Sequence, residues 1–475
     1  QRVYCAVLSA IQAGALLPGA RLPSARQLAS EWRISRSAVD DAYEQLQIEG
    51  LIGRRVGDGS YVTEGASGLA GRLAAPAPPL RREPSELTMQ VLRRFGPWLQ
   101  PAPHLDLRPR PLRAMVPDVD SFPLDTWRRL AADALGEGVG AGRSGLYYGH
   151  PQGEEALRAA TARHLTLTQA APCRPEQVVI VNSVLQAYEL IVRVLLMPGD
   201  TVALEDPGFI STARLLALSH LDVVGIPLDR QGLSVNALAK LAPHAAAVFL
   251  HAFNQYPTGI VTSAVRSAEL MRWAERSGAW VVDTHLMREV AHDAPPPTGL
   301  AMLDGSERTL TVGTYAAMTF PSLRLAYLVV PERLVDVFVA VRGLLGDHSP
   351  VANQTALAAY LDRGHASRRL RAVRMLYQRR RDLMQELLRR HLPRGVQLGP
   401  MTGGVNVALH WPPSLPDHEV VERLAARGVT AGSLSSHAIR AGACNGLIAG
   451  YGGYEPHAIE AAVAVLGEVL RASHR

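Results

Sequence analysis

The segment Gly313–Tyr327 reads GTYAAMTFPSLRLAY and lies between two apolar runs. The run before it, Thr309–Val312, is rich in β-branched residues, and the run after it is Leu328–Val330. Apolar runs on both sides of a segment that contains Pro321 predict a strand, a tight turn and a second strand. The segment contains no lysine, and Lys240 is the one lysine among the 49 basic residues of the chain.

Similar apolar runs alternate with amphipathic stretches over residues 106–350, which we interpret as one large α/β domain. This alternation predicts a mostly parallel sheet wrapped by helices. The expected strands are Val178–Val181, Thr201–Leu204, Val223–Ile226, Ala247–His251, Trp280–Asp283, Thr309–Val312 and Leu325–Val330. The expected helices are Gly153–Leu165, Leu185–Leu196, Phe209–Leu218, Ser263–Ser277 and Pro331–Leu344. Residues 351–475 predict further helices and a small α+β subdomain.

The first 63 residues predict a separate small α+β domain. Ser24 is a candidate N-cap for a helix that ends near Trp32, and a second helix is expected from Arg36 to Glu49. Two short strands follow, ending at Val62. Two helices and a β-wing in this order predict a winged helix-turn-helix. Residues 64–105 are rich in proline and alanine and predict a linker with one short helix, Glu86–Phe95.

Residues 1–63 resemble the GntR-type winged helix-turn-helix. The matching positions share one register and are Gly14–Ser24 (GALLPGARLPS), Ile34–Arg36 (ISR), Glu49–Leu51 (EGL) and Gly57–Val62 (GDGSYV). The resemblance implies double-stranded operator DNA as the partner. The N-terminus of the Arg36–Glu49 helix would enter the major groove, while Asp40 and Asp41 should face away from the DNA. The expected DNA-binding residues are Arg21, Ser24, Arg26, Ser35, Arg36, Ser37, Arg54, Arg55 and Gly57.

Composition sets wider limits on the function. The 475 residues suit two or three domains, and a net charge of +6 mildly favours polyanions. Three dispersed cysteines argue against a disulfide framework or a zinc site and favour a reducing cytoplasm. We find no apolar run long enough to span a membrane and no signal segment, so a cytoplasmic location is expected.

The larger part of the chain resembles the fold-type I aminotransferase domain as it is fused to a winged helix in MocR/GabR-like regulators. The matching motifs include Tyr148–Gly153 (YGHPQG), Glu205–Phe209 (EDPGF), Gln255–Gly259 (QYPTG) and the segment around Arg324. Together the two resemblances cover nearly the whole chain. They imply a homodimer, with a head-to-tail pair as one arrangement, because fold-type I active sites are normally built across two subunits.

The positions that bind pyridoxal phosphate in the family have changed. The resemblance places Ala317 at the Schiff-base lysine, Ala316 at a phosphate-binding serine, Thr284 at the aspartate of the pyridine nitrogen and Leu286 at the tyrosine of the ring hydroxyl. The phosphate-cradling Ser-Gly pair is Asn182-Ser183. Pyridoxal phosphate chemistry needs an amine and an anion at such positions. We therefore predict no covalent cofactor and no enzyme activity, and no metal site.

A pocket at the carboxyl ends of the strands remains a candidate ligand site. The side chains expected to converge there are Tyr148, Phe209, Asn254, Tyr256, Asp283, His285, Tyr315 and Arg324. A one-residue slip would let Asp283 take the role lost at Thr284. The opposite interpretation is that side chains fill the pocket, Met287 and Met318 among them.

The sequence thus predicts a dimeric, sequence-specific transcriptional regulator whose aminotransferase-like domain dimerises and senses a ligand other than pyridoxal phosphate. Two alternatives stay open. One is an enzyme that uses pyridoxal or pyridoxamine phosphate non-covalently, and the other is a regulator whose large domain is a dimerisation scaffold alone. The sequence does not identify the operator, the effector or the direction of regulation.

Overall fold

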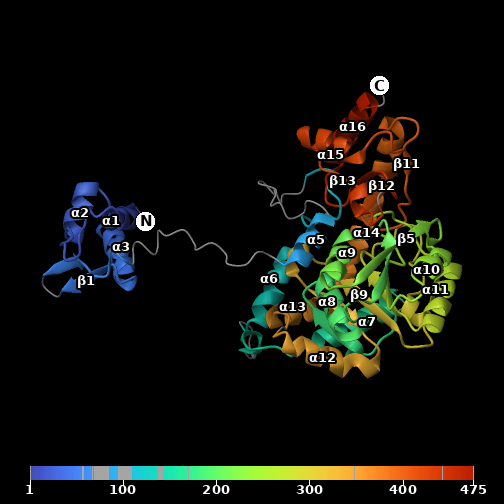
Figure 1. Ribbon diagram of the computed structural model, residues 1–475, viewed down its shortest axis with the longest axis horizontal. Coiled ribbons are helices and arrows are strands. Elements are labelled where there is room, and N and C mark those ends of the chain that lie inside the picture. The colour runs from blue at the N-terminus through green and yellow to red at the C-terminus, as the bar shows by residue number, and fades with distance from the viewer. Residues whose placement is uncertain are drawn as a thin grey trace. The chain divides into compact units, whose positions relative to one another are not determined.

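The computed structural model describes residues 2–55, 58–66, 68, 85–94, 110–136, 143–169, 171–346, 348–440 and 442–473. The chain forms two compact units, Gln1–Pro84 and Ser85–Arg475. Figure 1 draws both, and each is described by itself.

The first unit is a winged helix-turn-helix, as the sequence predicted. Its elements are α1 (Arg2–Gln12), α2 (Ala25–Trp32), α3 (Arg36–Ile48), β1 (Ile52–Arg55) and β2 (Gly59–Val62). The two strands pair antiparallel, with Ile52 opposite Val62. The buried faces of the three helices supply one apolar core with these strands, so this small unit has a core of its own.

The second unit is built on an eight-stranded sheet with the order β3-β10-β9-β8-β7-β4-β5-β6. Four pairings are parallel: β9-β8, β8-β7, β7-β4 and β4-β5. At one end β10 pairs antiparallel with β3 and β9, and at the other end β6 pairs antiparallel with β5. The mostly parallel sheet expected from the sequence is therefore confirmed. The strands are β3 (Val178–Val181), β4 (Thr201–Asp206), β5 (Asp222–Asp229), β6 (Gly232–Leu233), β7 (Ala247–Leu250), β8 (Trp280–His285), β9 (Thr309–Thr314) and β10 (Ala326–Val329).

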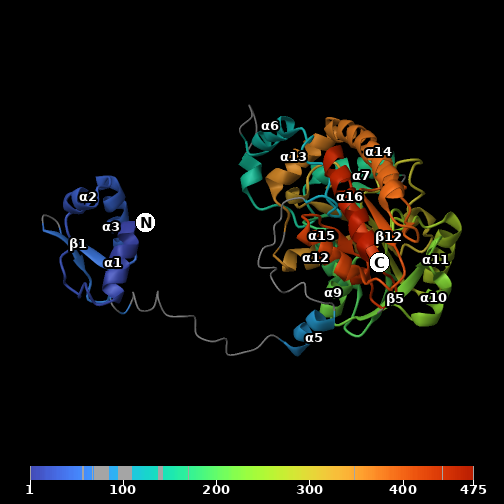
Figure 2. The same cartoon turned by 90° about the horizontal axis from the view of Figure 1, so that it is seen from above.

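Helices cover both faces of this sheet because each strand buries side chains on both sides. On one face, alternate residues such as Val282 and Val312 pack in a core with residues of α8 (Val184–Leu195), α9 (Ile210–Leu218) and α12 (Val335–Leu344). On the other face lie α6 (Leu124–Ala134), α7 (Glu155–Gln169), α10 (Val235–Leu241), α11 (Ala264–Ser277) and α13 (Val351–Asp362). Figures 1 and 2 both place α10 and α11 together near β5.

A small C-terminal subdomain completes the second unit. It has a four-stranded sheet of β11 (Gln397–Leu398), β12 (Asn406–His410), β14 (Gly446–Gly450) and β13 (Gly432–Ser433). The helices are α14 (His365–His391), α15 (Asp417–Ala426) and α16 (Pro456–Ser473). Figure 2 shows α14 and α16 side by side, and their buried residues share one core with β12 and β14.

The helix expected inside the linker is present as α5 (Glu86–Arg94). It packs against α9, and its Val91 is buried in the core of the second unit. The segment over residues 64–105 therefore contains an element that belongs to the second unit. Among the described helices, none is both long and apolar enough to cross a membrane.

Candidate functional site

The N-terminus of α3 is an exposed surface of the first unit. Ser35 caps the helix, because its Oγ accepts a hydrogen bond from the Ala38 amide at 3.3 Å. Arg36 and Ser37 follow in the first turn and are exposed. A capped and exposed helix N-terminus favours anions, and DNA phosphates in particular.

Asp40 lies on this same surface, against our expectation that it faces away. Its carboxylate is 3.4 Å from Arg36 Nε and 3.9 Å from Arg54 Nη2 of the wing strand β1. The reason is helical spacing, since residues 36 and 40 are one turn apart. Asp41 is exposed and makes no ion pair with any described residue.

The other expected DNA-binding residues surround α3. Ser24 caps α2 by accepting a hydrogen bond from the Gln27 amide, and Arg26 is exposed in the next turn. Arg21 donates to the Asp58 carbonyl, and the Arg55 guanidinium lies 4.9 Å from the Tyr61 ring centre. Gly57 lies outside the described residues. Apart from Arg21, which lies before α2 and bridges to Tyr61 of β2, the described members lie in or cap α2 and α3 or belong to the wing, the elements that a winged helix presents to DNA.

The N-terminus of α8, where the resemblance places the phosphate cradle, is capped by its own side chains. Gln186 Oε1 accepts a hydrogen bond from the Asn182 amide at 2.6 Å, and Ser183 Oγ accepts one from the Gln186 amide at 3.0 Å. Arg342 of α12, which is 2% exposed, donates to the same Gln186 oxygen at 3.3 Å. The Asn182 and Gln186 amides and the Arg342 guanidinium at this helix end are therefore already bonded within the chain.

The Thr284 hydroxyl is also engaged. Its Oγ1 lies 2.6 Å from the hydroxyl of Tyr188, a fully buried side chain of α8 that packs against Phe249. Burial raises the pKa of Tyr188. Leu286, two residues on, is buried and offers no polar group.

The alanines of the turn after β9 lie in an apolar environment. Ala317 is 3% exposed and belongs to the core that contains Tyr315 and Met318. Ala316 is half-buried, and its amide donates to Thr314 Oγ1 at 3.2 Å. No nucleophile or base is therefore present at either position.

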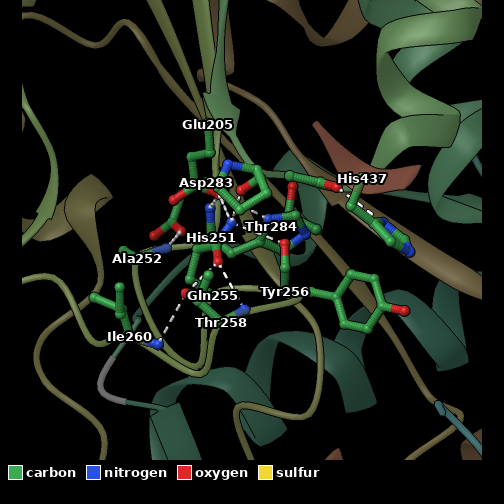
Figure 3. Close-up of polar contacts among 12 residues, drawn as sticks. Glu205, His251, Ala252, Gln255, Tyr256, Thr258, Ile260, Asp283, Thr284 and His437 are labelled. Carbon is green, nitrogen blue, oxygen red and sulfur yellow. Dashed lines mark hydrogen bonds and ion pairs between the residues drawn. The ribbon is translucent and has the colours of Figure 1, made fainter. Parts of the chain in front are cut away.

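Three aromatic rings, two of them from expected pocket residues, contact one another. The Phe209 and Tyr256 rings meet edge to face at 5.8 Å, and Tyr256 meets His437 in the same way at 5.2 Å. Figure 3 shows Tyr256 and His437 beside a hydrogen-bonded group of Glu205, His251 and Gln255. A cavity of about 10 Å³ lies among Phe209, His437, Glu205 and His251. That volume is close to the least that holds one water molecule.

Three of the expected pocket residues lie elsewhere. Asp283 and His285 alternate with Thr284 along β8, so they face the opposite side of the sheet. There Asp283 accepts from the Ala252 and Leu300 amides and pairs with His285 Nε2 at 3.1 Å. Tyr315 is buried in the core on that side, with its hydroxyl 2.6 Å from Thr161 Oγ1. The suggestion that Asp283 replaces the lost aspartate is therefore wrong.

Burial raises the pKa of the Asp283 carboxyl, but His285, Arg288 and the backbone donor from Leu300 outweigh it and lower this pKa to about 2. Asp283 is thus a charged residue of the core and not a pocket group.

The remaining expected pocket residues are Tyr148, Arg324 and Asn254. Tyr148 is 95% exposed and contacts His348 edge to face. Arg324 has a left-handed backbone with φ 55°, is exposed, and makes no hydrogen bond or ion pair with the described residues. Asn254 also has positive φ and lies against the backbone of Gly404.

Gln186 and Tyr188 are the residues that sequence reasoning missed. Both lie inside an apolar helical pattern and carry no motif. The available signal was Asn182-Ser183 at the start of this helix, because a Ser N-cap followed three residues later by Gln predicts a capping box.

Two family models match the chain. The model "Aminotransferase class I and II" matches residues 116–441, and the model "Bacterial regulatory proteins, gntR family" matches residues 1–62.

Relatives with both parts are similar over almost the full length. The chain is 28% identical to "Probable rhizopine catabolism regulatory protein MocR" of Rhizobium meliloti, covering 96% of this chain and 90% of the relative. It is 29% identical to "HTH-type pyridoxine biosynthesis transcriptional regulator PdxR" of Corynebacterium glutamicum, covering 96% and 92%.

Solved structures similar to the second unit are aminotransferases. The Thermus thermophilus α-aminoadipate aminotransferase LysN is 25% identical with a TM-score of 0.70, over 76% of this chain and 92% of that one. The kynurenine aminotransferase of Pyrococcus horikoshii has a TM-score of 0.72 at 20% identity, over 85% and 98%, which supports the fold alone.

Proposed function

Since this chain belongs to the aminotransferase class I and II family and carries an N-terminal GntR-type helix-turn-helix, we propose that it is a sequence-specific DNA-binding transcriptional regulator. Relatives that share both parts over nine tenths of their length are named as regulators. This supports regulation of transcription over amino-acid metabolism as the role of the whole chain.

The observation that carries the proposal is the exposed surface of the first unit. The capped N-terminus of α3 presents Arg36 and Ser37, and the wing presents Arg54 beside them. A helix of this kind reads base edges in the major groove, while wing arginines hold the phosphate backbone.

A gel-shift assay tests the proposal with DNA from upstream of the protein's own gene. We expect one region to be bound in an excess of competitor DNA, with affinity that falls steeply as salt rises. The variant Arg36→Ala should lose most of this binding, whereas Arg471→Ala, which changes an arginine of α16 in the second unit, should not. Equal binding of the upstream region and the competitor would remove the proposal.

We further propose that the large domain works without pyridoxal phosphate. The residues present do not fit this cofactor: the Asn182 amide and the Thr284 hydroxyl are already bonded within the chain, and Ala317 has no amine. An absorbance titration tests this. We expect no visible band when pyridoxal phosphate is added and full recovery of free cofactor on dialysis, and a retained coloured species would contradict the proposal.

Dimerisation is the role we propose for this domain. Leu146, Tyr147 and Tyr148 form a run of large exposed side chains, between 64% and 95% exposed, and Leu344 is 86% exposed. Apolar surface of this kind is typical of an interface between subunits. Sedimentation equilibrium should give twice the chain mass, and Tyr148→Asp should shift the protein towards the monomer.

The space that we propose for a sensed ligand is separate from the small cavity beside Phe209 and His437. A cavity of about 390 Å³ lies between residues of the large domain, such as Pro207 and Thr258, and residues of the C-terminal subdomain, such as Trp411 and Cys444. A ligand that contacts both parts would bias their arrangement. A thermal-shift screen of metabolites with wild type and Trp411→Ala tests this, because a true ligand raises Tm in the wild type alone.

A further inference from the structure

Three charged side chains from two elements meet on the exposed surface of the first unit. Arg36 begins α3 and Arg54 lies in the wing strand β1, and both lie within ion-pair distance of the single carboxylate of Asp40, at 3.4 and 3.9 Å. The side chains of Arg36, Asp40 and Arg54 are 71%, 43% and 44% exposed. The carboxylate is therefore part of the surface that the two arginines form.

A carboxylate at this place is unfavourable for DNA in general. It repels the phosphates and occupies two arginines that would otherwise bind them. The exposed ion pairs themselves are weak, so DNA can replace Asp40 as the partner of either arginine. After that exchange the carboxylate faces the groove without a partner.

One feature of the major groove offsets this cost. The amino group of cytosine is a hydrogen-bond donor at the base edge, and Asp and Glu side chains accept from it. Binding sites that lack such a donor leave the carboxylate unpaired and are rejected, which is how a repulsive group creates specificity.

We propose that Asp40 is a specificity-determining residue of this chain and that it accepts a hydrogen bond from the amino group of a cytosine in the operator. The inference rests on the proposed DNA-binding function and adds the chemistry of one recognised base. Asp41, the next residue of the same helix, carries the same charge but contacts neither arginine, and it provides the matched control.

Selection of bound sequences from random double-stranded DNA, with the full chain, tests the inference. We expect the wild type to select sites with a fixed cytosine. Asp40→Asn should replace that cytosine by adenine, because an amide pairs with the adenine edge. Asp40→Ala should bind competitor DNA more tightly and lower the operator-to-competitor affinity ratio about tenfold. Asp41→Ala should keep the selected sequence.

The outcomes distinguish a failure of the role of Asp40 from a failure of the proposed DNA-binding function. If the wild type selects a sequence that Asp40→Asn and Asp40→Ala both retain, the role of Asp40 is wrong while the DNA-binding function stands. The role is equally wrong if Asp41→Ala changes the selected sequence as much as Asp40→Ala does. If the wild type selects no sequence, the proposed function and this inference fail together.

Discussion

Among single residues, Asp283 shows how burial assigns a polar group to the core. Asp283 is adjacent in sequence to a position that binds cofactor in the family, yet its carboxylate is fully buried on the other side of the sheet. It accepts two backbone hydrogen bonds and pairs with His285. A charge with this many partners supports the core and has no capacity left for a ligand.

Asp283→Asn should lower the free energy of unfolding by about 3 kcal/mol, because it leaves His285 buried without its charged partner. The lowered pKa of Asp283 determines how the stability of the fold changes with pH. The carboxylate stabilises the fold above its usual pKa near 3.9, and this stabilisation is lost as pH falls towards 2. Urea unfolding at neutral pH measures the change. The exposed Asp222→Asn should stay within about 0.5 kcal/mol of wild type, and an equal effect of both changes would contradict this account.

At the scale of elements, β9 and β10 are the two strands that the sequence predicted. The tight turn expected between them is wrong, because residues 315–325 join the strands and include a short 3-10 helix, Pro321–Leu323. Tyr327 pairs with Gly313 across the two strands, and a Cβ at Gly313 would lie 2.2 Å from the Tyr327 ring. Glycine is therefore required at this position for the strands to approach. The apolar turn between them holds Ala317 inside the core, which leaves little room for a longer side chain.

Ala317→Lys should not restore cofactor binding, because the lysine would enter a packed apolar core while the helix end of α8 stays capped by Gln186. We expect this change to lower the free energy of unfolding by about 2 kcal/mol and to add no visible absorbance with pyridoxal phosphate. Ala316→Lys, at the half-buried neighbouring position, should cost less. A coloured and stable Ala317→Lys protein would refute this account of the turn.

The strands were predictable because short apolar runs that alternate with amphipathic stretches are a strong signal. Both β3 and β9 begin at the expected residues. The pocket was less predictable. Which face of β8 carries Asp283 depends on register, and a shift of one residue reverses it. The bond between Tyr188 and Thr284 joins positions 96 residues apart, so no local pattern reveals it. The position of Asp40 beside Arg54 also depends on packing between elements.

For the molecule as a whole, the second unit holds its two parts together with a few polar contacts. His437 of the C-terminal subdomain donates from Nδ1 to the Gly208 carbonyl at 3.1 Å, and Arg440 pairs with the buried Asp206 at 2.7 Å. These contacts join the end of β4 to the subdomain. They place the aromatic site at the junction of the two parts.

This junction should weaken in acid. Burial lowers the pKa of His437 to about 4, well below the ordinary value near 6.5. The folded state disfavours the charged imidazole. Above pH 6.5 His437 therefore does not lower the free energy of unfolding, and it destabilises the fold as pH falls from 6.5 towards 4. Between pH 7 and 4.5 the contribution is about 2 kcal/mol. His437→Gln should lose that part of the pH dependence, whereas the exposed His457→Gln should keep it.

We propose that this chain reads DNA and does so without pyridoxal phosphate. The most direct test is the affinity of the cofactor-stripped full chain for its own upstream region, measured in competitor DNA before and after addition of pyridoxal phosphate. We predict specific binding in the stripped protein and an affinity that the cofactor leaves unchanged. Specific binding that appears only after pyridoxal phosphate is added would contradict the claim.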